Sequence, residues 1–325
     1  PVILKPAEQS VLSGWQVFQA YREAGIPDEV VQFLCGPGEK IGPKLVEDPR
    51  VAVVVFTGSR EVGTQIAEKA NIKSPDQKQL KKFIIEMGGK NAAIIDETAD
   101  FDQAIPAVLH SAFTYAGQKC SALSRLIVLD AVYDSFIKRL VEAAQVFPFG
   151  NPMEPETFCG PVIDQESVER VQKAAAEGKS QGRLLFEASG RELPKGNYVR
   201  PVIFDGLPED ARILKDEIFG PVLTVIRAKH FEQALKIAND SAFGLTGGLF
   251  SRTPSHIEKA KQEIQVGNLY INRAITGAVV RRQPFGGYKM SGTGTKAGSI
   301  EYLREFFYER TISENISRHG FAPLD

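Results

Sequence analysis

The stretch 86–122 begins with EMGGKNAAIID (86–96) and ends with FTYAGQKCSA (113–122). An apolar run at 83–86 ends on a carboxylate, Glu86, and Gly88-Gly89 follow at once, which is typical of a strand that leaves its sheet at a turn. A second apolar run, 92–95, begins directly after the glycines. The pattern predicts a hinge between two α/β units, with the segment before it in one sheet and the segment after it in another.

Cys120 is the candidate nucleophile of this stretch, 34 residues beyond Glu86. A thiol attacks only as thiolate, so its site must lower the thiol pKa or supply a base. His110 is the one nearby histidine in sequence, and apolar residues surround it on a predicted helix. The candidate base is therefore a carboxylate, which suits activation of water. Without further motifs, Cys120 would be interpreted as a small buried apolar residue, the usual fate of a free cysteine.

The pair EMGGK and GQKCSA resembles the paired signatures of the aldehyde dehydrogenase superfamily, and the resemblance extends over essentially the whole chain. It implies that Glu86 is the general base and Cys120 the nucleophile. It also implies an α/β fold with an incomplete Rossmann-type cofactor domain, an α/β catalytic domain and a short C-terminal oligomerisation arm. The corresponding boundaries are residues 1–87, 88–290 and 291–325, the last including a substrate-anchor loop.

Composition excludes several classes of protein. Lys plus Arg is 39 and Asp plus Glu is 40 in 325 residues, so the net charge of −1 gives no reason to expect nucleic acid or an anionic membrane as partner. The longest apolar run, 51–56, is too short to span a bilayer. Three cysteines without a C-x-x-C pair or a histidine cluster argue against a disulfide framework or a metal site and for a reducing compartment. We expect a cytoplasmic protein, or a mitochondrial matrix protein in a eukaryote.

Upstream of the hinge, apolar runs at 2–4, 30–34 and 50–56 alternate with helical patterns, which predicts a doubly wound α/β unit. The third run is nearly all apolar and predicts a strand buried on both faces. It leads into the turn 58–63, which fails the G-x-G-x-x-G template because position 60 is Arg, and fails the P-loop template because position 64 is Thr. What remains is a helix N-terminus that suits a phosphate, or a plain N-cap at Ser59.

The family resemblance favours the phosphate, because FTGSREVG (56–63) is similar to the family's NAD pyrophosphate turn. Lys5 and Glu8 of KPAEQS resemble its ribose-binding residues, and Glu8 would repel the 2′-phosphate of NADP. Glu217 and Phe219, two apart on a segment expected to be extended, resemble the pair that holds the nicotinamide end. The residues that the resemblance assigns to NAD are Lys5, Glu8, Gly38, Gly58, Ser59, Gly63, Gly88, Glu217 and Phe219.

The tail from 268 to 303 resembles the Δ1-pyrroline-5-carboxylate, or L-glutamate γ-semialdehyde, dehydrogenase branch of the family. The resemblance assigns the substrate's α-carboxylate to Ser121, Gly298 and Ser299, and places Phe306 near its aliphatic chain. A glycine turn with a free N–H and a hydroxyl can form such a nest, or can simply be a surface turn. Residues 311–325 resemble an arm that pairs subunits, so we expect a homo-oligomer.

Several alternatives stay open. A cysteine hydrolase or acyltransferase would share the nucleophile but need no dinucleotide. The chain begins at Pro1 inside a predicted strand, and we expect a fragment that lacks the first part of the cofactor domain and an oxyanion-binding Asn. It is then either an incompetent piece or the end of a longer enzyme fused to a proline dehydrogenase domain. A dehydrogenase of another semialdehyde also fits.

Overall fold

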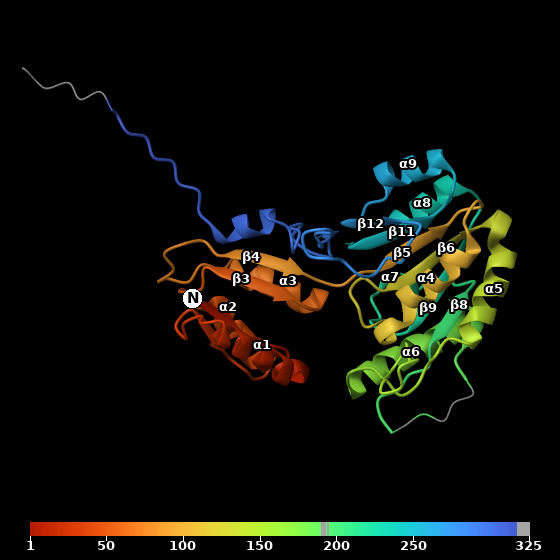
Figure 1. Cartoon of the computed structure of the whole chain (residues 1–325), viewed down its shortest axis with the longest axis horizontal. Coiled ribbons are helices and arrows are strands. Elements are labelled where there is room, and N and C mark those ends of the chain that lie inside the picture. Colours follow the sequence, from red (N-terminus) through yellow and green to blue (C-terminus); the bar gives the residue numbers. More distant parts are fainter. Residues whose placement is uncertain (190–192, 194, 317–325) are drawn as a thin grey trace, which may run out of the picture.

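Two groups of strands make up the molecule, and the Gly88-Gly89 hinge joins them (Figure 1). The computed structural model describes residues 1–189, 193 and 195–316. In the first group, β1 (Val2–Leu4) pairs in parallel with β2 (Val31–Phe33). Helix α1 (Val11–Glu23) covers this pair through an aromatic cluster in which the rings of Trp15, Phe18 and Phe33 lie 5.4–5.6 Å apart.

The second pair of this group, β3 (Val53–Thr57) and β4 (Lys82–Glu86), is also parallel and packs on α3 (Arg60–Ala70), while α2 (Gly38–Glu47) lies against α3. The prediction that the 50–56 run is buried on both faces was wrong. Every residue of β3 is at least partly exposed, and Val55 is 52% exposed. The cause is that β3 has β4 as its one neighbouring strand and α3 on one face, so the other face lacks cover among the described residues.

Beyond the hinge, seven strands form one sheet in the order β12-β11-β5-β6-β9-β8-β7. All neighbours are parallel except β7 and β8. The strands are β5 (Asn91–Ile95), β6 (Leu123–Leu129), β7 (Arg183–Glu187), β8 (Val202–Asp205), β9 (Val222–Ala228), β11 (Thr246–Phe250) and β12 (Asn268–Ile271). Sequence analysis predicted the α/β class and the strand after the hinge; both are confirmed.

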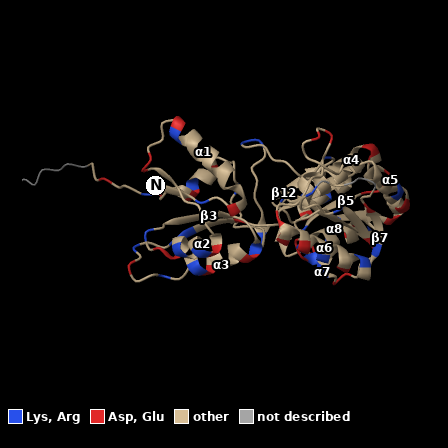
Figure 2. Ribbon diagram, turned by 90° about the horizontal axis from the view of Figure 1, so that it is seen from below, with Lys and Arg blue, Asp and Glu red and all other residues tan. Residues whose placement is uncertain are grey.

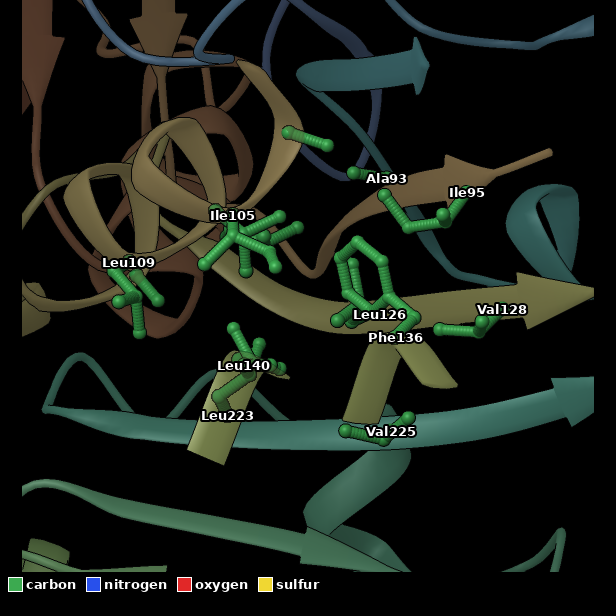
Figure 3. Close-up of a cluster of buried hydrophobic side chains, with 14 of the residues drawn as sticks. Ala93, Ile95, Ile105, Leu109, Leu126, Val128, Phe136, Leu140, Leu223 and Val225 are labelled. Atoms are coloured by element: carbon green, nitrogen blue, oxygen red, sulfur yellow. The ribbon is translucent and has the colours of Figure 1, made fainter. Parts of the chain in front are cut away.

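Side chains of the central strands alternate between two apolar layers, because successive residues of a strand face opposite sides. On one face, Ala93 and Ile95 of β5 pack with Leu126 and Val128 of β6 against α4 (Phe101–Phe113) and α5 (Tyr133–Gln145), as Figure 3 shows. On the other face, Ala92 and Ile94 join Ile127 and the helices α8 (Phe231–Asn239) and α9 (Pro254–Glu263). The sheet is thus sandwiched between helices on both faces.

A third apolar layer packs α6 (Gln165–Gln181) and α7 (Arg212–Lys215) against β8 and β9. The remaining elements are short: β10 (Phe243–Gly244), β13 (Tyr288–Lys289), and 3₁₀ turns at Glu8–Ser10, Thr114–Gly117, Asp130–Val132 and Glu301–Phe306. None of the helices in the described part of the chain is long and apolar enough to cross a membrane. Positions of Lys and Arg and positions of Asp and Glu are interspersed along the ribbon (Figure 2).

The topology brings several loops to one edge. The hinge precedes β5, Cys120 precedes β6 and Glu217 precedes β9, and these parallel strands are neighbours in the sheet. Their amino ends therefore meet at one edge. The carboxyl ends of β3 and β4, at Gly58 and Glu86, lie near this edge because the hinge that follows β4 is short. The two ends are joined by a hydrogen bond from the Gly58 N–H to the Glu86 carbonyl oxygen at 3.1 Å.

Candidate active site

The loop that carries Cys120 is held in an uncommon conformation. Tyr115, Ala116 and Gly117 have φ of 55°, 54° and 68°, a left-handed run that side chains with a Cβ rarely adopt. A Cβ on Gly117 would lie 2.3 Å from the Gly220 carbonyl oxygen, so only glycine lets the two loops touch. Asn91 Nδ2 donates to the carbonyl oxygens of Cys120 and Ala122, both at 2.8 Å. The backbone at the cysteine is therefore fixed by the first residue of β5.

The Cys120 thiol is half-buried, and burial raises its pKa to about 11. The carboxylates of Glu217 and Glu86 add to that rise, while the backbone N–H groups of Ser121 and Cys120 oppose it. Sequence analysis required either a lowered thiol pKa or a nearby base. The free site does not lower the pKa, so a base must supply the thiolate. Both carboxylates that interact with the thiol are candidates.

Glu86, at the end of β4, has a carboxylate that is buried without a hydrogen-bond partner among the described residues. Burial raises its pKa to about 7, and the rise is opposed by the Gly287 N–H, which is near the carboxylate but outside hydrogen-bond geometry, and by Lys296. Two glycines make room for it, because a Cβ on Gly286 or on Gly292 would lie 3.0 Å from Oε1. A carboxyl that titrates near neutrality and has free lone pairs is suited to take a proton from water.

Glu217 occupies a different setting in the loop before β9. Its Oε1 accepts the Gly89 N–H at 3.1 Å, and a Cβ on Gly88 would lie 1.7 Å from Oε2. Burial raises its pKa, and Lys90 is among the cations that counter the rise. The hinge glycines thus seat this carboxylate against the backbone, so Gly88 serves the site by lacking a side chain.

An open cleft of about 820 Å³ connects Cys120 and Glu217 to the first unit, and Glu86 is not among its lining residues in the described part of the chain. Cys120, Glu217 and Phe219 line it together with Gly58 and Ser59 of the turn before α3. Ser59 Oγ accepts the Val62 N–H at 3.3 Å, which confirms that Ser59 is the N-cap of α3. The end of the helix that it caps lies at the cleft. The interpretation of 217–219 as an extended segment was wrong: Phe219 has φ of 53°, and the two residues that line the cleft, Glu217 and Phe219, lie in an irregular loop and not in a strand.

Three of the predicted cofactor residues lie together elsewhere in the first unit. Lys5 Nζ is 3.3 Å from Glu8 Oε1, which also accepts the Gly38 N–H. Gly63 does not line the cleft among the described residues. It lets α3 approach β4, because a Cβ there would lie 2.5 Å from Met87 Sδ.

The residues predicted to bind the substrate come from two parts of the chain: Ser121 follows Cys120 directly, whereas Gly298, Ser299 and Phe306 follow β13. Ser121 is buried, and its carbonyl oxygen accepts from Thr246 Oγ1 at 3.3 Å. Gly298 has φ of 78°, which favours glycine. The Ser299 hydroxyl donates to the Lys296 carbonyl oxygen at 2.7 Å and accepts the Tyr302 N–H at 3.1 Å, so it caps the following turn. Phe306 ends that turn and is 45% exposed.

Sequence analysis missed one wall of the cleft and the surroundings of the base. Helix α6 lines the cleft with charged side chains at a helical spacing that could have revealed one shared face: Glu166, Arg170, Lys173 and Glu177. Arg170 also donates to the Ile218 carbonyl oxygen at 2.9 Å and so holds the Glu217 loop. Lys296 carried no signal, since a single lysine among glycines has none. In the described part of the chain, no three His, Cys, Asp or Glu residues are grouped to hold a metal ion.

Comparison with known proteins gives one family. The sequence model described as "Aldehyde dehydrogenase family" matches residues 1–312. A 1-pyrroline-5-carboxylate dehydrogenase of Bacillus subtilis (strain 168) is 44% identical over 96% of this chain and 61% of its own length. The chain therefore spans about three fifths of the length of such relatives.

Solved structures agree. A 1-pyrroline-5-carboxylate dehydrogenase from Thermus with bound NAD is 48% identical, with a TM-score of 0.90 over 94% of this chain and 59% of its own. Proline utilization A from Bdellovibrio bacteriovorus, inactivated by N-propargylglycine, is 47% identical, with a TM-score of 0.95 over 100% of this chain and 34% of its own.

Proposed function

The chain belongs to the aldehyde dehydrogenase family, and on that basis we propose that the natural protein containing it oxidises L-glutamate γ-semialdehyde to L-glutamate with NAD. The semialdehyde is the open form of Δ1-pyrroline-5-carboxylate. The observation that carries the proposal is that one thiol interacts with two carboxylates of unlike setting and lines a cleft of about 820 Å³. The relatives named 1-pyrroline-5-carboxylate dehydrogenase support the choice of substrate.

The residues of the cleft fit a dinucleotide. The N-terminus of α3, which follows Gly58 and Ser59 at the cleft, suits a phosphate, and Glu217, seated where Gly88 lacks a Cβ, suits ribose hydroxyls next to the flat ring of Phe219. Lys5, Glu8 and Gly38 lie together in the first unit, where the adenine end would bind. When bound, NAD would supply the hydride acceptor for the oxidation. A solved relative is described with NAD bound, which supports this cofactor.

The chain's own residues account for the two covalent steps. Cys120 loses its proton to a base and its sulfur bonds to the aldehyde carbon, with the Cys120 N–H available to the oxyanion. After loss of hydride the acyl group is a thioester on Sγ. Glu86 then takes a proton from water, hydroxide replaces the sulfur, and the thiolate is released. The sum is aldehyde, water and oxidised cofactor giving carboxylate, reduced cofactor and two protons.

We propose that Ser121, Gly298, Ser299 and Phe306 bind the substrate, the first three at its α-carboxylate. The buried position of Ser121 beside the thiol and the left-handed backbone of Gly298 support this.

The whole chain matches one third of proline utilization A from Bdellovibrio bacteriovorus, and another solved proline utilization A is described as bifunctional. Both findings support a second candidate, fusion to a proline dehydrogenase domain. Exposed apolar side chains at Phe307, Tyr308, Ile312 and Ile316 support a homo-oligomer built through the tail.

The test is NADH formation by the natural protein, by its Cys120→Ala variant and by the control Cys35→Ala, since Cys35 is an exposed cysteine outside the cleft. Removing a nucleophile should lower turnover by at least about 10⁴-fold, whereas the control should keep it. A carboxylate nest left unpaired is costly, so glutamate semialdehyde should exceed pentanal in kcat/KM by far more than about 200-fold. Equal values would discard this substrate, and full activity of Cys120→Ala would discard the mechanism.

A further inference from the structure

Lys296 is a half-buried lysine in the loop after β13, and its ammonium group binds three oxygen atoms. Nζ donates to Asn268 Oδ1 at 2.9 Å, to the Gly286 carbonyl oxygen at 2.7 Å and to the Gly267 carbonyl oxygen. An ammonium has three donors, so these bonds use all of them. The side chain is therefore held in one place, joining the end of the β11–β12 connection to the glycine loop 286–292.

That place is beside the carboxylate of Glu86. Gly286, which accepts from Lys296, is one of the two glycines whose missing Cβ makes room for Glu86 Oε1. The lysine and the carboxylate interact electrostatically: Lys296 lowers the pKa of Glu86, and Glu86 raises the pKa of Lys296 against the larger effect of burial. Lys296 thus fixes the wall of the carboxylate's pocket and supplies a positive charge to it.

The same residue also reaches the loop of the proposed substrate anchors. Its carbonyl oxygen accepts the Ser299 hydroxyl at 2.7 Å and the Ser299 N–H at 3.3 Å. The side chain of Lys296 therefore contacts the surroundings of the base while its backbone holds Ser299. One residue connects the two regions.

We propose that Lys296 is a positioning residue that keeps Glu86 ionised and in place for attack of water on the acyl group of Cys120. This rests on the proposed function of Glu86 as general base. The titratable groups that interact with Glu86 in the described part of the chain are Lys296, Cys120 and Tyr302. Lys296 is the one cation among them, so its loss leaves the burial of the carboxylate less opposed.

The test isolates hydrolysis of the acyl group from hydride transfer and from NAD. p-Nitrophenyl acetate acetylates Cys120 with release of p-nitrophenol; water then hydrolyses the thioester to acetate and thiol, with Glu86 taking the proton from water. Intact-mass measurement of the acetylated protein, after removal of excess ester, gives the hydrolysis rate at each pH. In the parent, the hydrolysis rate plotted against pH should have a rising limb with its midpoint near pH 7, where Glu86 titrates.

Lys296→Met and Lys296→Gln should both move this limb upward by about half a pH unit or more, and Lys296→Arg should restore it, since it keeps the charge. The matched control is Lys289→Met. Lys289 Nζ also donates to two backbone carbonyl oxygens, of Asn239 and Ser241 at 3.2 and 3.3 Å, but Glu86 is not among its charged neighbours. Its limb should stay in place. Lys296→Gln keeps a donor without charge, so it serves if Lys296→Met fails to fold.

The outcomes separate this inference from the proposed function. A limb that stays in place in Lys296→Gln but is lost in Glu86→Gln overturns the role of Lys296 and leaves the base standing. A limb that persists in Glu86→Gln overturns the base itself. A shift of equal size in Lys289→Met would assign the effect to general loosening of the loop and would also overturn the inference.

Discussion

Two carboxylates interact with the same thiol, yet their surroundings are opposite. Glu217 is bound by a backbone N–H at 3.1 Å and seated where its neighbour Gly88 lacks a side chain. Glu86 has no hydrogen-bond partner among the described residues and lies in a pocket walled by Gly286 and Gly292, some 200 residues further along the chain. A fixed, hydrogen-bonded carboxylate is suited to bind a ligand. A carboxylate with unused lone pairs and a pKa near neutrality is suited to move a proton.

The difference shows that the type of residue does not decide its role; the donors around it do. Burial raises the pKa of both carboxyls, but the Gly89 N–H and several cations counter the rise at Glu217, whereas at Glu86 the Gly287 N–H and then a single cation, Lys296, counter it. We propose that Glu217 serves the cofactor and Glu86 serves water. The following substitutions test that division of labour.

The largest of these effects is expected for Gly88→Ala, because its Cβ would lie 1.7 Å from Glu217 Oε2 and force the carboxylate from its seat. Loss of a hydrogen bond to a charged group costs about 1.5–3 kcal/mol, so the affinity for NAD should fall about 10- to 100-fold. Isothermal titration with NAD measures this. The control is Gly42→Ala in α2, where an added Cβ has no atom within 4 Å; its affinity should match the parent. Equal affinities in both variants would show that Glu217 does not bind NAD.

A smaller effect is expected on stability at neutral pH. The folded protein raises the pKa of Glu86 from its ordinary value of 4.5 to about 7. The unfolded chain therefore ionises first, and stability should fall as pH rises from about 4.5 to 7. Gln mimics the neutral acid, so Glu86→Gln should gain roughly 1–2 kcal/mol over the parent above pH 7 and nothing below pH 4.5, after allowance for partial exposure. Urea unfolding at pH 4.5 and 8 measures it.

The control for stability is Glu217→Gln, which should gain less, because the amide binds the Gly89 N–H less strongly than the carboxylate does. A gain independent of pH in Glu86→Gln, or an equal gain in both variants, would contradict the contrast between the two pockets.

Local patterns predicted most of the fold. The apolar run before the hinge and the run after it became β4 and β5, and the alternation of strands and helices gave the α/β class. The exposure of β3 could not be predicted, because a strand of Val and Phe looks the same whether one face or both are covered. Strands β8 and β12 were missed. Their residues 202–205 and 268–271 are short runs whose burial depends on neighbours distant in sequence.

For the site, the motifs at Glu86, Cys120 and Glu217 located three side chains that the fold does bring together, but not the cause of their different environments. That cause lies in Gly286, Gly292 and Lys296, which approach Glu86 only in three dimensions. The left-handed backbone of Phe219 could not be predicted either, since a Phe with φ of 53° has no signature in sequence. The part of the predicted arm from 317 to 325 lies outside the described residues.

The most direct test of the division of labour is intact-mass analysis of Glu86→Gln and Glu217→Gln, mixed rapidly with glutamate semialdehyde and NAD. We predict that Glu86→Gln forms one equivalent of NADH quickly and then retains an acyl group on Cys120, because Gln cannot take a proton from water. Glu217→Gln should turn over without a retained acyl group, and saturating NAD should restore much of its rate. An acyl group retained by Glu217→Gln and absent from Glu86→Gln would contradict the account.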